Sequence, residues 1–158
     1  MIRVIACGRM REKWMKEGAA EYLKRIGAYD RIEVTEVADE KAPQSNSDAE
    51  NRKVKEIEGV RLLRAIHENE YVILLDLAGK TCSSEGLADK IASLQTRGQS
   101  RIDFVIGGSL GLSDELIRRA DERWKISDNT FPHQLCRIIV LEQIYRAFRI
   151  MNNEPYHK

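Results

Sequence analysis

The sequence has few of the residues that cross-link or interrupt a chain. Its 158 residues include 3 cysteines and 3 prolines, and an odd number of widely spaced cysteines predicts free thiols, not a disulfide framework. No apolar run approaches the ~20 residues that a membrane-spanning helix requires. The first residues include Arg3 and lack an apolar stretch before a small-residue cleavage site, so they do not predict a signal peptide. We therefore expect a single cytoplasmic domain spanning residues 1–158.

An excess of charge of one sign is also missing. The chain has 26 basic and 25 acidic residues and a net charge of +1, which excludes a protein that coats nucleic acid through bulk positive charge. The distribution is uneven, because residues 1–25 contain seven basic and three acidic residues, and residues 133–158 contain four and two. These two ends favour binding of a polyanion by local patches. The alternative is an ordinary solvated surface.

Short apolar runs alternate with stretches of helical periodicity along the chain. Strands are predicted where apolar residues gather in short runs, over residues 2–7, 32–37, 71–75, 102–106 and 124–126. Helices are predicted between and after them, over residues 14–26, 47–66, 84–97, 113–120 and 132–151. Strands that alternate with helices predict an α/β fold with a mainly parallel sheet flanked by helices.

The last predicted helix is apolar around most of its circumference. Between residues 137 and 151 its apolar side chains cover roughly 260° of the helical wheel, and the polar stripe consists of Glu142, Arg146 and Arg149. One face of a sheet covers about half of that arc, so we expect a second copy of the chain to cover the rest and to form a homodimer. The alternative is a helix packed between the sheet and its own loops.

A glycine-rich turn follows the fourth predicted strand, at residues 107–111. Open α/β sheets bind ligands in this position. The spacing matches neither the dinucleotide motif Gly-x-Gly-x-x-Gly nor a phosphate-binding P-loop, and a plain tight turn is the alternative. Ser109 is centred in a Gly-x-Ser-x-Gly pattern, and Glu142 followed by His157 would complete the chain order of a hydrolase triad. A serine hydrolase is therefore an alternative function.

The other side chains that could take part in catalysis or binding concentrate near the end of the chain. No metal site is predicted, because the three histidines lack the spacing of metal ligands. Arg137 falls in the apolar arc, where an arginine is costly unless it is paired or faces a ligand; the alternative is a packed stem whose head reaches solvent. Glu142 and Arg146, four residues apart with the acid first, predict a helical ion pair. Residues 155–158 indicate, on physical grounds alone, a frayed tail.

Several short motifs in a fixed order carry a resemblance that covers the full length. They are Asp39-Glu40-Lys41-Ala42-Pro43, Leu75-Asp76-Leu77-Ala78-Gly79-Lys80, Ser83-Ser84-Glu85, Phe104-Val105-Ile106-Gly107-Gly108, Thr130-Phe131-Pro132-His133-Gln134, Glu142-Gln143-Ile144-Tyr145-Arg146-Ala147 and Tyr156-His157-Lys158. With these motifs the chain resembles the ribosomal large subunit pseudouridine methyltransferase H family, a branch of the SPOUT-type methyltransferases.

The resemblance implies an enzyme that uses S-adenosyl-L-methionine (SAM) to methylate N3 of a pseudouridine in 23S (large-subunit) rRNA of the assembled ribosome. It also implies a homodimer and a SPOUT-type fold with a C-terminal trefoil knot. The near-neutral charge then favours recognition of the shape of the ribosome together with contacts from the basic ends of the chain. A non-enzymatic ribosome-associated factor that keeps the fold is a further alternative.

The same resemblance implies where the cofactor binds. Its contacts fall on three stretches that each follow a predicted strand, namely Leu75, then Gly107, then the loop formed by Ile126, Ser127, Asp128, Asn129, Thr130 and Phe131. Apolar residues would flank the adenine, while backbone groups of the loops would hydrogen-bond its edges.

The resemblance also implies a set of catalytic residues near the C-terminus. His133, Glu142 and His157 are the candidates for the base that accepts the N3 proton, with no order among them. Arg137 and Arg146 are candidates for contacts with phosphate or the uracil oxygens, and Tyr156 for stacking on the base or orienting it.

Overall fold

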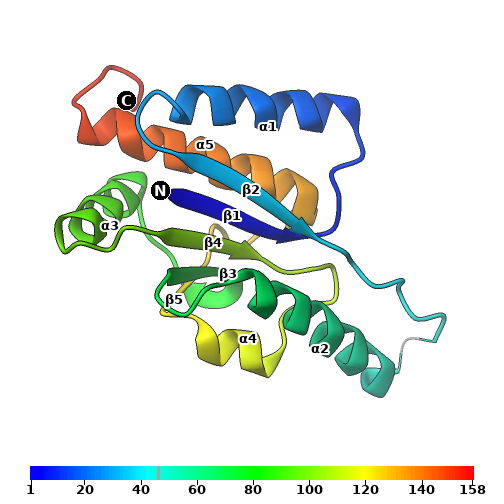
Figure 1. Ribbon diagram of the computed structural model, residues 1–158. Coiled ribbons are helices and arrows are strands. Elements are labelled where there is room, and N and C mark those ends of the chain that lie inside the picture. The colour runs from blue at the N-terminus through cyan, green and yellow to red at the C-terminus, as the bar shows by residue number, and fades with distance from the viewer. Residues whose placement is uncertain (46) are drawn as a thin grey trace.

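Five parallel strands form one sheet at the centre of the molecule. The computed structural model describes residues 1–45 and 47–158 (Figure 1). Within these residues the strand order is β2-β1-β4-β3-β5, and every pairing is parallel. The strands are β1 (Ile2–Cys7), β2 (Ile32–Val37), β3 (Tyr71–Lys80), β4 (Ile102–Ile106) and β5 (Glu122–Trp124). The predicted parallel α/β sheet is therefore confirmed.

Two inner strands, β1 and β4, are buried along their length, whereas the edge strands and the outer part of β3 are not. Every residue of β1 and β4 is buried, as expected of strands covered on both faces. The edge strand β5 lies at residues 122–124, not at 124–126, and β3 continues to Lys80, beyond its predicted end at residue 75. The apolar run ends at Leu75, but Trp124 pairs with Leu75 and again with Lys80 across an irregularity, so pairing extends the strand where burial does not.

Five helices connect or follow the strands in the described part of the chain. They are α1 (Lys13–Ile26), α2 (Asp48–Ala65), α3 (Ser84–Thr96), α4 (Asp114–Arg119) and α5 (His133–Met151). Serine hydroxyls cap three of them by accepting a backbone N–H of the first turn, from Ser47 for α2, Ser83 for α3 and Ser113 for α4. The helix starts predicted at residues 47 and 113 are confirmed, and α5 begins directly after Pro132.

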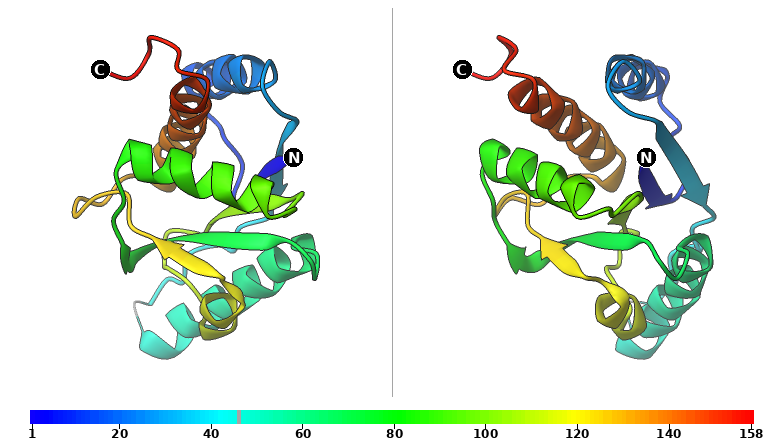
Figure 2. Two further views of the ribbon diagram at one scale, coloured as in Figure 1. Left: turned by 90° about the vertical axis from the view of Figure 1, so that its left-hand side faces the viewer. Right: turned by 60° about the vertical axis from the view of Figure 1, so that its left-hand side comes forward.

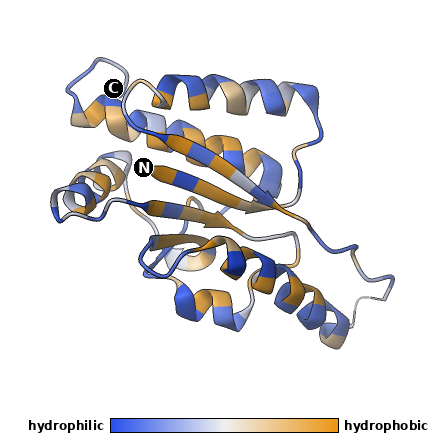
Figure 3. Ribbon diagram, viewed as in Figure 1, coloured by the Kyte–Doolittle hydropathy of each residue, from blue (hydrophilic) through white to orange (hydrophobic). Residues whose placement is uncertain are grey.

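The helices form a layer on each face of the sheet. Figure 2 shows α1, α3 and α5 on one face and α2 and α4 on the other, and each layer encloses its own apolar core. Hydrophobic residues concentrate on the strands and on the inner sides of the helices (Figure 3). The helix α5 packs between α1 and α3, so these neighbours and the sheet cover much of its apolar arc. This arrangement agrees with the alternative of a helix packed within its own chain.

Three charged residues are buried at the edge where the strands begin. Arg3 of β1 donates to both carboxylate oxygens of Asp103 on β4, at 3.0 Å and 2.8 Å. It also pairs with Glu70, which directly precedes β3. Asp103 is fully buried and Glu70 is 4% exposed. Buried charges are tolerated only when they are paired, and here the three side chains pair with one another.

Two further properties follow from the described residues. None of the helices over residues 1–45 and 47–158 is long and apolar enough to cross a membrane. The three cysteines carry free thiols, with Cys7 buried, Cys136 half-buried and Cys82 exposed.

Candidate functional site

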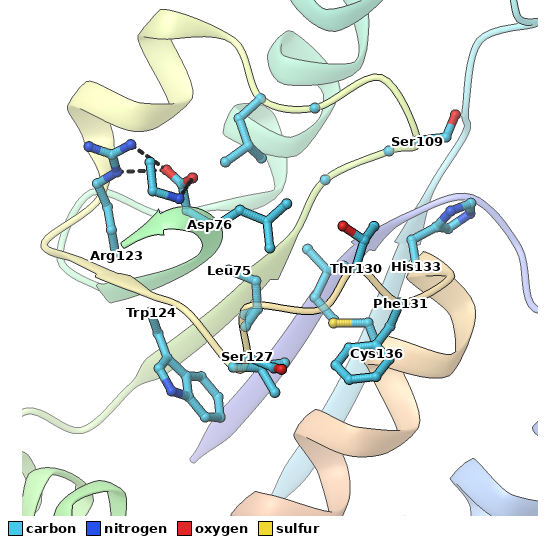
Figure 4. A pocket seen from close by; sticks show the side chains of 18 of the residues that line it. Leu75, Asp76, Ser109, Arg123, Trp124, Ser127, Thr130, Phe131, His133 and Cys136 are labelled. Carbon is cyan, nitrogen blue, oxygen red and sulfur yellow. Dashed lines mark hydrogen bonds and ion pairs between the residues drawn. The ribbon is translucent and has the colours of Figure 1, made fainter. Parts of the chain in front are cut away.

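A cavity of 760 Å³ opens at the edge where the strands end (Figure 4). Three segments that are far apart in the sequence form it: the outer part of β3, the glycine turn after β4, and the loop after β5. The lining residues are Leu75, Asp76, Leu77, Ala78, Ile106, Gly107, Gly108, Ser109, Gly111, Leu112, Ile117, Arg123, Trp124, Ile126, Ser127, Asn129, Thr130, Phe131, Pro132, His133 and Cys136. Ligands of open α/β sheets bind at this edge, and the volume is that of a site for a small organic molecule.

The deep walls of the cavity are apolar. Leu75 and Trp124 are 9% and 5% exposed, and Ile126 and Phe131 are half-buried. Ser127 and Thr130 come from the same loop as the apolar residues and also line the space (Figure 4). A flat heterocycle fits between such walls, while hydroxyl and backbone groups are available for its polar edges.

The glycine turn lies close against its surroundings. Gly111 adopts a φ of +105°, which side-chain-bearing residues rarely adopt. A Cβ on Gly108 would lie 2.6 Å from Oε1 of Glu58, a residue of α2 that is only 4% exposed. Glu58 in turn accepts hydrogen bonds from the Cys7 thiol, at 2.9 Å, and from the backbone N–H of Glu40, at 3.2 Å. The buried carboxylate of Glu58 therefore packs against the glycine turn.

An ion pair ties β3 to β5 beside the cavity. Arg123 donates to the Asp76 carboxylate at 2.6 Å, and the Asp76 side chain is 10% exposed. Asp76 also accepts the backbone N–H of Ala78 at 2.9 Å. Sequence reasoning missed this pair, although Asp76 directly follows the predicted cofactor contact Leu75.

The structure brings most of the predicted cofactor residues together. Leu75, Gly107 and the residues of the loop 126–131 line the cavity, with Asp128 as the exception. Asp128 points into solvent, its side chain 92% exposed, and it pairs with Lys125 at 2.6 Å. This pairing lowers the pKa of Asp128. Leu75 lies within β3 and not after it, because the strand is longer than predicted.

Among the described residues that line the cavity, His133 is the only predicted catalytic residue. It is the first residue of α5 and lies close to the end of β1, where a Cβ on Gly8 would be 3.5 Å from its Nε2. Ser109 also lines the cavity, and Figure 4 shows both residues on the same side of it.

A second group of predicted residues forms a separate cluster further along α5. Glu142 accepts hydrogen bonds from Arg146 at 3.0 Å and from the Tyr156 hydroxyl at 3.1 Å, which confirms the predicted helical ion pair. Arg146 also lies 4.7 Å above the Tyr156 ring and 3.2 Å from Nδ1 of His157. His157 bonds to Glu85 of α3 at 2.7 Å. Burial and then Glu142 raise the pKa of Tyr156 to about 12. The expected frayed tail is instead held by these contacts.

The cavity and the cluster lie on different sides of α5. His133 and Glu142 are nine positions apart, which corresponds to half a turn of rotation and about 14 Å of helix length. Glu142, Tyr156 and His157 are not among the residues that line the cavity. A single chain therefore separates His133 from Glu142, Tyr156 and His157.

Arg137 has a third setting, inside the protein. It is 1% exposed, donates to the backbone oxygen of Gly8 at 2.9 Å and pairs with Glu36 of β2 at 3.1 Å. The expected alternative of a head that reaches solvent does not apply. Burial lowers the pKa of the guanidinium, while Glu36 opposes that change. In this structure Arg137 positions the end of β1, and a contact with substrate stays a prediction.

Two other chemistries have less support. Ser109 is exposed at the cavity, whereas Glu142 and His157 lie in the separate cluster, so the triad of a serine hydrolase is not assembled. Over residues 1–45 and 47–158, no three histidine, cysteine or acidic side chains come together as metal ligands.

The sequence carried a weak signal for Glu58, which was missed, and it singled out Arg137 without identifying the partner of that residue. Glu58 lies at helical spacing from the apolar residues of α2 and is therefore an acid on an inward face. Arg137 lies four residues after His133, so both belong to one face at the start of α5. Neither pattern identifies the partner, because the contacts with Cys7, Gly108 and Glu36 join segments far apart in the chain.

Together, the parallel α/β sheet and the cavity at the ends of its strands define an α/β protein with a candidate site for a small organic molecule. The chain matches, over residues 1–157, a protein family described as "Predicted SPOUT methyltransferase". It is 53% identical to the ribosomal RNA large subunit methyltransferase H of Bacillus cytotoxicus and 52% identical to that of Bacillus cereus, over 99% of each chain. The chain belongs to the SPOUT methyltransferase family and is a methyltransferase.

Two solved structures share the fold at low sequence identity. A methylase family protein from Haemophilus influenzae aligns with a TM-score of 0.55 at 14% identity, over 96% of this chain and 66% of that one. A methyltransferase from Legionella pneumophila in complex with SAM aligns with a TM-score of 0.52 at 15% identity, over 92% and 66%. These likenesses concern the fold.

Proposed function

We propose that the protein uses SAM to methylate N3 of a pseudouridine in 23S rRNA, acting on the assembled ribosome in the cytoplasm. The observation that carries the proposal is the 760 Å³ cavity, which gathers seven of the eight predicted cofactor residues from three segments. The names of the relatives that are about half identical over their full length support rRNA of the large subunit as the substrate. The base and its N3 atom rest on the motif resemblance.

The cavity suits SAM in its distribution of polar and apolar groups. Leu75, Ile126 and Phe131 offer apolar surfaces for the adenine ring. Ser127, Asn129 and Thr130 offer polar side chains for the ribose and the amino acid end. Gly108 has no side chain, and this allows the turn that lines the cavity to pack against the buried carboxylate of Glu58.

When bound, SAM supplies a methyl group that is already activated on its sulfonium. The residues of this chain then have two tasks, to align N3 of the base with the methyl carbon and to accept the N3 proton. His133 is placed at the cavity to accept that proton. Arg146 and Tyr156, with Glu142 and His157, form a preorganised surface that can hold the uracil oxygens, the base or a phosphate.

We further propose a homodimer whose sites are shared. His133 and Glu142 lie on opposite sides of α5, so a two-fold arrangement is needed to place the cluster of one chain beside the cavity of its partner. An exposed aromatic residue supports such a contact, because Trp14 on α1 is 57% exposed. It lies in the helix that packs beside α5, near the contact of Gly18 with Ile138.

We propose that residues 1–158 form one domain and that its last third is a trefoil knot. From the sheet edge at β5, the loop 126–131 returns past Leu75 and Gly107, and His133 then lies beside Gly8 at the end of β1. The chain thus passes the ends of β3, β4 and β1 before α5 begins. This return of the chain past three strand ends supports a C-terminal knot.

The function is tested with ribosomes from cells that lack this gene. Purified protein is incubated with SAM and with either 70S ribosomes, isolated large subunits or free 23S rRNA, and the rRNA nucleosides are analysed by mass spectrometry. We expect methylpseudouridine to form on the assembled ribosome, with much less product on free rRNA. His133→Ala should retain SAM binding by calorimetry and lose most of the product, whereas Ser109→Ala should retain both. The absence of a methylated nucleoside with wild-type protein that binds SAM would contradict the proposal.

A further inference from the structure

A short segment between β1 and α1, residues 8–12, carries two arginines that face solvent. Arg9 and Arg11 are exposed, while Met10 between them is 6% exposed and belongs to the apolar core. The side chains on either side of a buried residue therefore project outward from the protein.

The backbone of this segment is fixed at several points. The N–H of Gly8 donates to the backbone oxygen of Val37 at 2.8 Å, and its own oxygen accepts from the buried Arg137 at 2.9 Å. Gly8 adopts a φ of +87°, which defines the sharp departure from β1. The N–H of Arg11 donates to the side-chain oxygen of Gln134 on α5 at 3.2 Å. These contacts, with Met10 as an anchor, hold the segment in one place.

The two guanidinium groups are not used by the protein itself. In the described part of the chain, neither Arg9 nor Arg11 forms a side-chain ion pair or hydrogen bond with another residue. Asp39 lies near Gly8, its Oδ2 3.7 Å from where a Cβ would be, yet it pairs with neither arginine. By contrast, Arg3, Arg61 and Arg123 each pair with a carboxylate. A rigid backbone that presents two unpaired guanidinium groups is a preformed site for anions.

The position of the segment relates these charges to the cofactor cavity. Gly8 lies next to His133, with 3.5 Å between its Cβ position and Nε2, and His133 lines the cavity. Arg11 is linked to Gln134, the residue after His133. The arginines are thus carried beside the one predicted catalytic side chain that borders the cavity.

We propose that Arg9 and Arg11 bind the backbone phosphates of the rRNA strand that presents its base to the cavity, and that Arg137 positions them by holding Gly8. The inference rests on the proposed function, because it takes rRNA as the anion. Arginine forks bind phosphate oxygens in pairs, and phosphate contacts fix the register of a nucleic acid without reading its sequence. With a net charge of +1, local contacts of this kind replace bulk attraction.

The test compares two double variants that remove the same charge. Arg9→Gln/Arg11→Gln removes two positive charges from the segment beside the cavity. Arg64→Gln/Arg97→Gln removes the same charge at the C-terminal ends of α2 and α3, toward the edge where the strands begin, and both of these arginines are exposed. Binding of ribosomes from cells that lack the gene is measured by sedimentation at several salt concentrations, SAM binding by calorimetry, and molecular mass in solution by light scattering. A third variant, Arg9→Lys/Arg11→Lys, keeps the charges.

We expect Arg9→Gln/Arg11→Gln to weaken ribosome binding about tenfold or more at low salt, and to lower the slope of log K against log salt by about two, one for each lost phosphate contact. The lysine variant should recover most of this loss, the control variant should stay within about twofold of wild type, and SAM binding should not change. Equal salt slopes for the two glutamine variants would overturn the inference. So would a change of molecular mass confined to Arg9→Gln/Arg11→Gln, because it would assign the arginines to a protein interface.

The two proposals fail in different ways. If wild-type protein binds ribosomes through Arg9 and Arg11 but transfers no methyl group, the proposed function fails and the inference stands. If wild-type protein methylates rRNA and the variant binds as tightly as the control, the inference fails and the function stands. Wild-type protein that neither binds nor methylates ribosomes refutes both.

Discussion

The two edges of the sheet use charged residues in opposite ways. Where the strands begin, Arg3, Asp103 and Glu70 are buried and bond to one another. Where the strands end, His133 lines the cavity and Arg9 follows Gly8, the residue that lies next to His133. Within the described residues neither of these two side chains has a protein partner. The first edge is complete within the chain, and the second offers groups that a cofactor or a nucleic acid can complete. Substitutions at the two edges should therefore affect stability and binding separately.

The largest effect is expected from Arg3→Met. The change retains the apolar stem but leaves the carboxylates of Asp103 and Glu70 buried without their common partner. Removing one member of a buried ionic group costs about 3–5 kcal/mol, and urea unfolding should show this loss in the free energy of unfolding. SAM affinity, measured below the unfolding transition, should be close to wild type.

The matched control for Arg3→Met is Arg31→Met, because Arg31 pairs with Glu33 at the surface with 73% of its side chain exposed. Exposed pairs contribute about 0–1 kcal/mol. If both variants lose the same small amount of stability, the buried group is not the stabilising feature described here.

A smaller effect, on binding instead of stability, is expected from Gly108→Ala. The new Cβ would lie 2.6 Å and 2.7 Å from the two oxygens of Glu58, so the turn or the acid must move. We expect calorimetry to show SAM affinity reduced about tenfold, equivalent to about 1.4 kcal/mol. The double variant Gly108→Ala/Glu58→Ala removes the clash and should bind SAM more tightly than Gly108→Ala alone. Strictly additive losses would show that Glu58 and the turn are not in contact.

The buried charged group at the edge where the strands begin should also make the free energy of unfolding depend on pH, with an effect of similar size. Burial, followed by the nearby Glu70, raises the pKa of Asp103 from 3.8 to about 6. A carboxyl whose pKa is higher in the folded state contributes stability that is full below pH 3.8 and is lost as the pH rises through 6. The free energy of unfolding of wild type, relative to Asp103→Asn, should therefore fall by on the order of 2 kcal/mol between pH 4 and pH 7. A difference that stays constant or rises with pH would contradict this shift.

The sequence predicted the fold in most respects because the signals were local. Apolar runs located four strands to within a residue or two of their starts, and the serines at 47 and 113 marked two helix starts. The end of β3 and the place of β5 were predicted poorly, since they depend on pairing between Lys80 and Trp124 across an edge that has no apolar pattern. Local patterns identify buried segments and caps but not the extent of an exposed pairing.

The residues of the site also fall into those that the sequence predicted and those whose contacts it did not predict. The family resemblance assigned Leu75, Gly107 and the loop 126–131 to the cofactor, and these stretches line one cavity at the edge where the parallel strands end. The surroundings of Arg137 were not predictable, because Glu36 is about a hundred residues away in the chain and no spacing rule relates the two. The homodimer also stays a prediction, since α1 and α3 cover much of the apolar arc that suggested it.

The smallest effect on stability is expected from Tyr156→Phe, in the cluster outside the cavity. Its hydroxyl, with a pKa of about 12, keeps its proton at neutral pH and donates to Glu142 at 3.1 Å. Loss of one such bond costs about 1 kcal/mol. If the cluster serves the substrate of a partner's cavity, kcat should fall while SAM affinity stays unchanged. Tyr71→Phe, which removes a hydroxyl 3.3 Å from Glu122 at the beginning of β3, should leave kcat as in wild type. A change in SAM affinity with Tyr156→Phe would mean that the cluster and the cavity of the same chain are not separate.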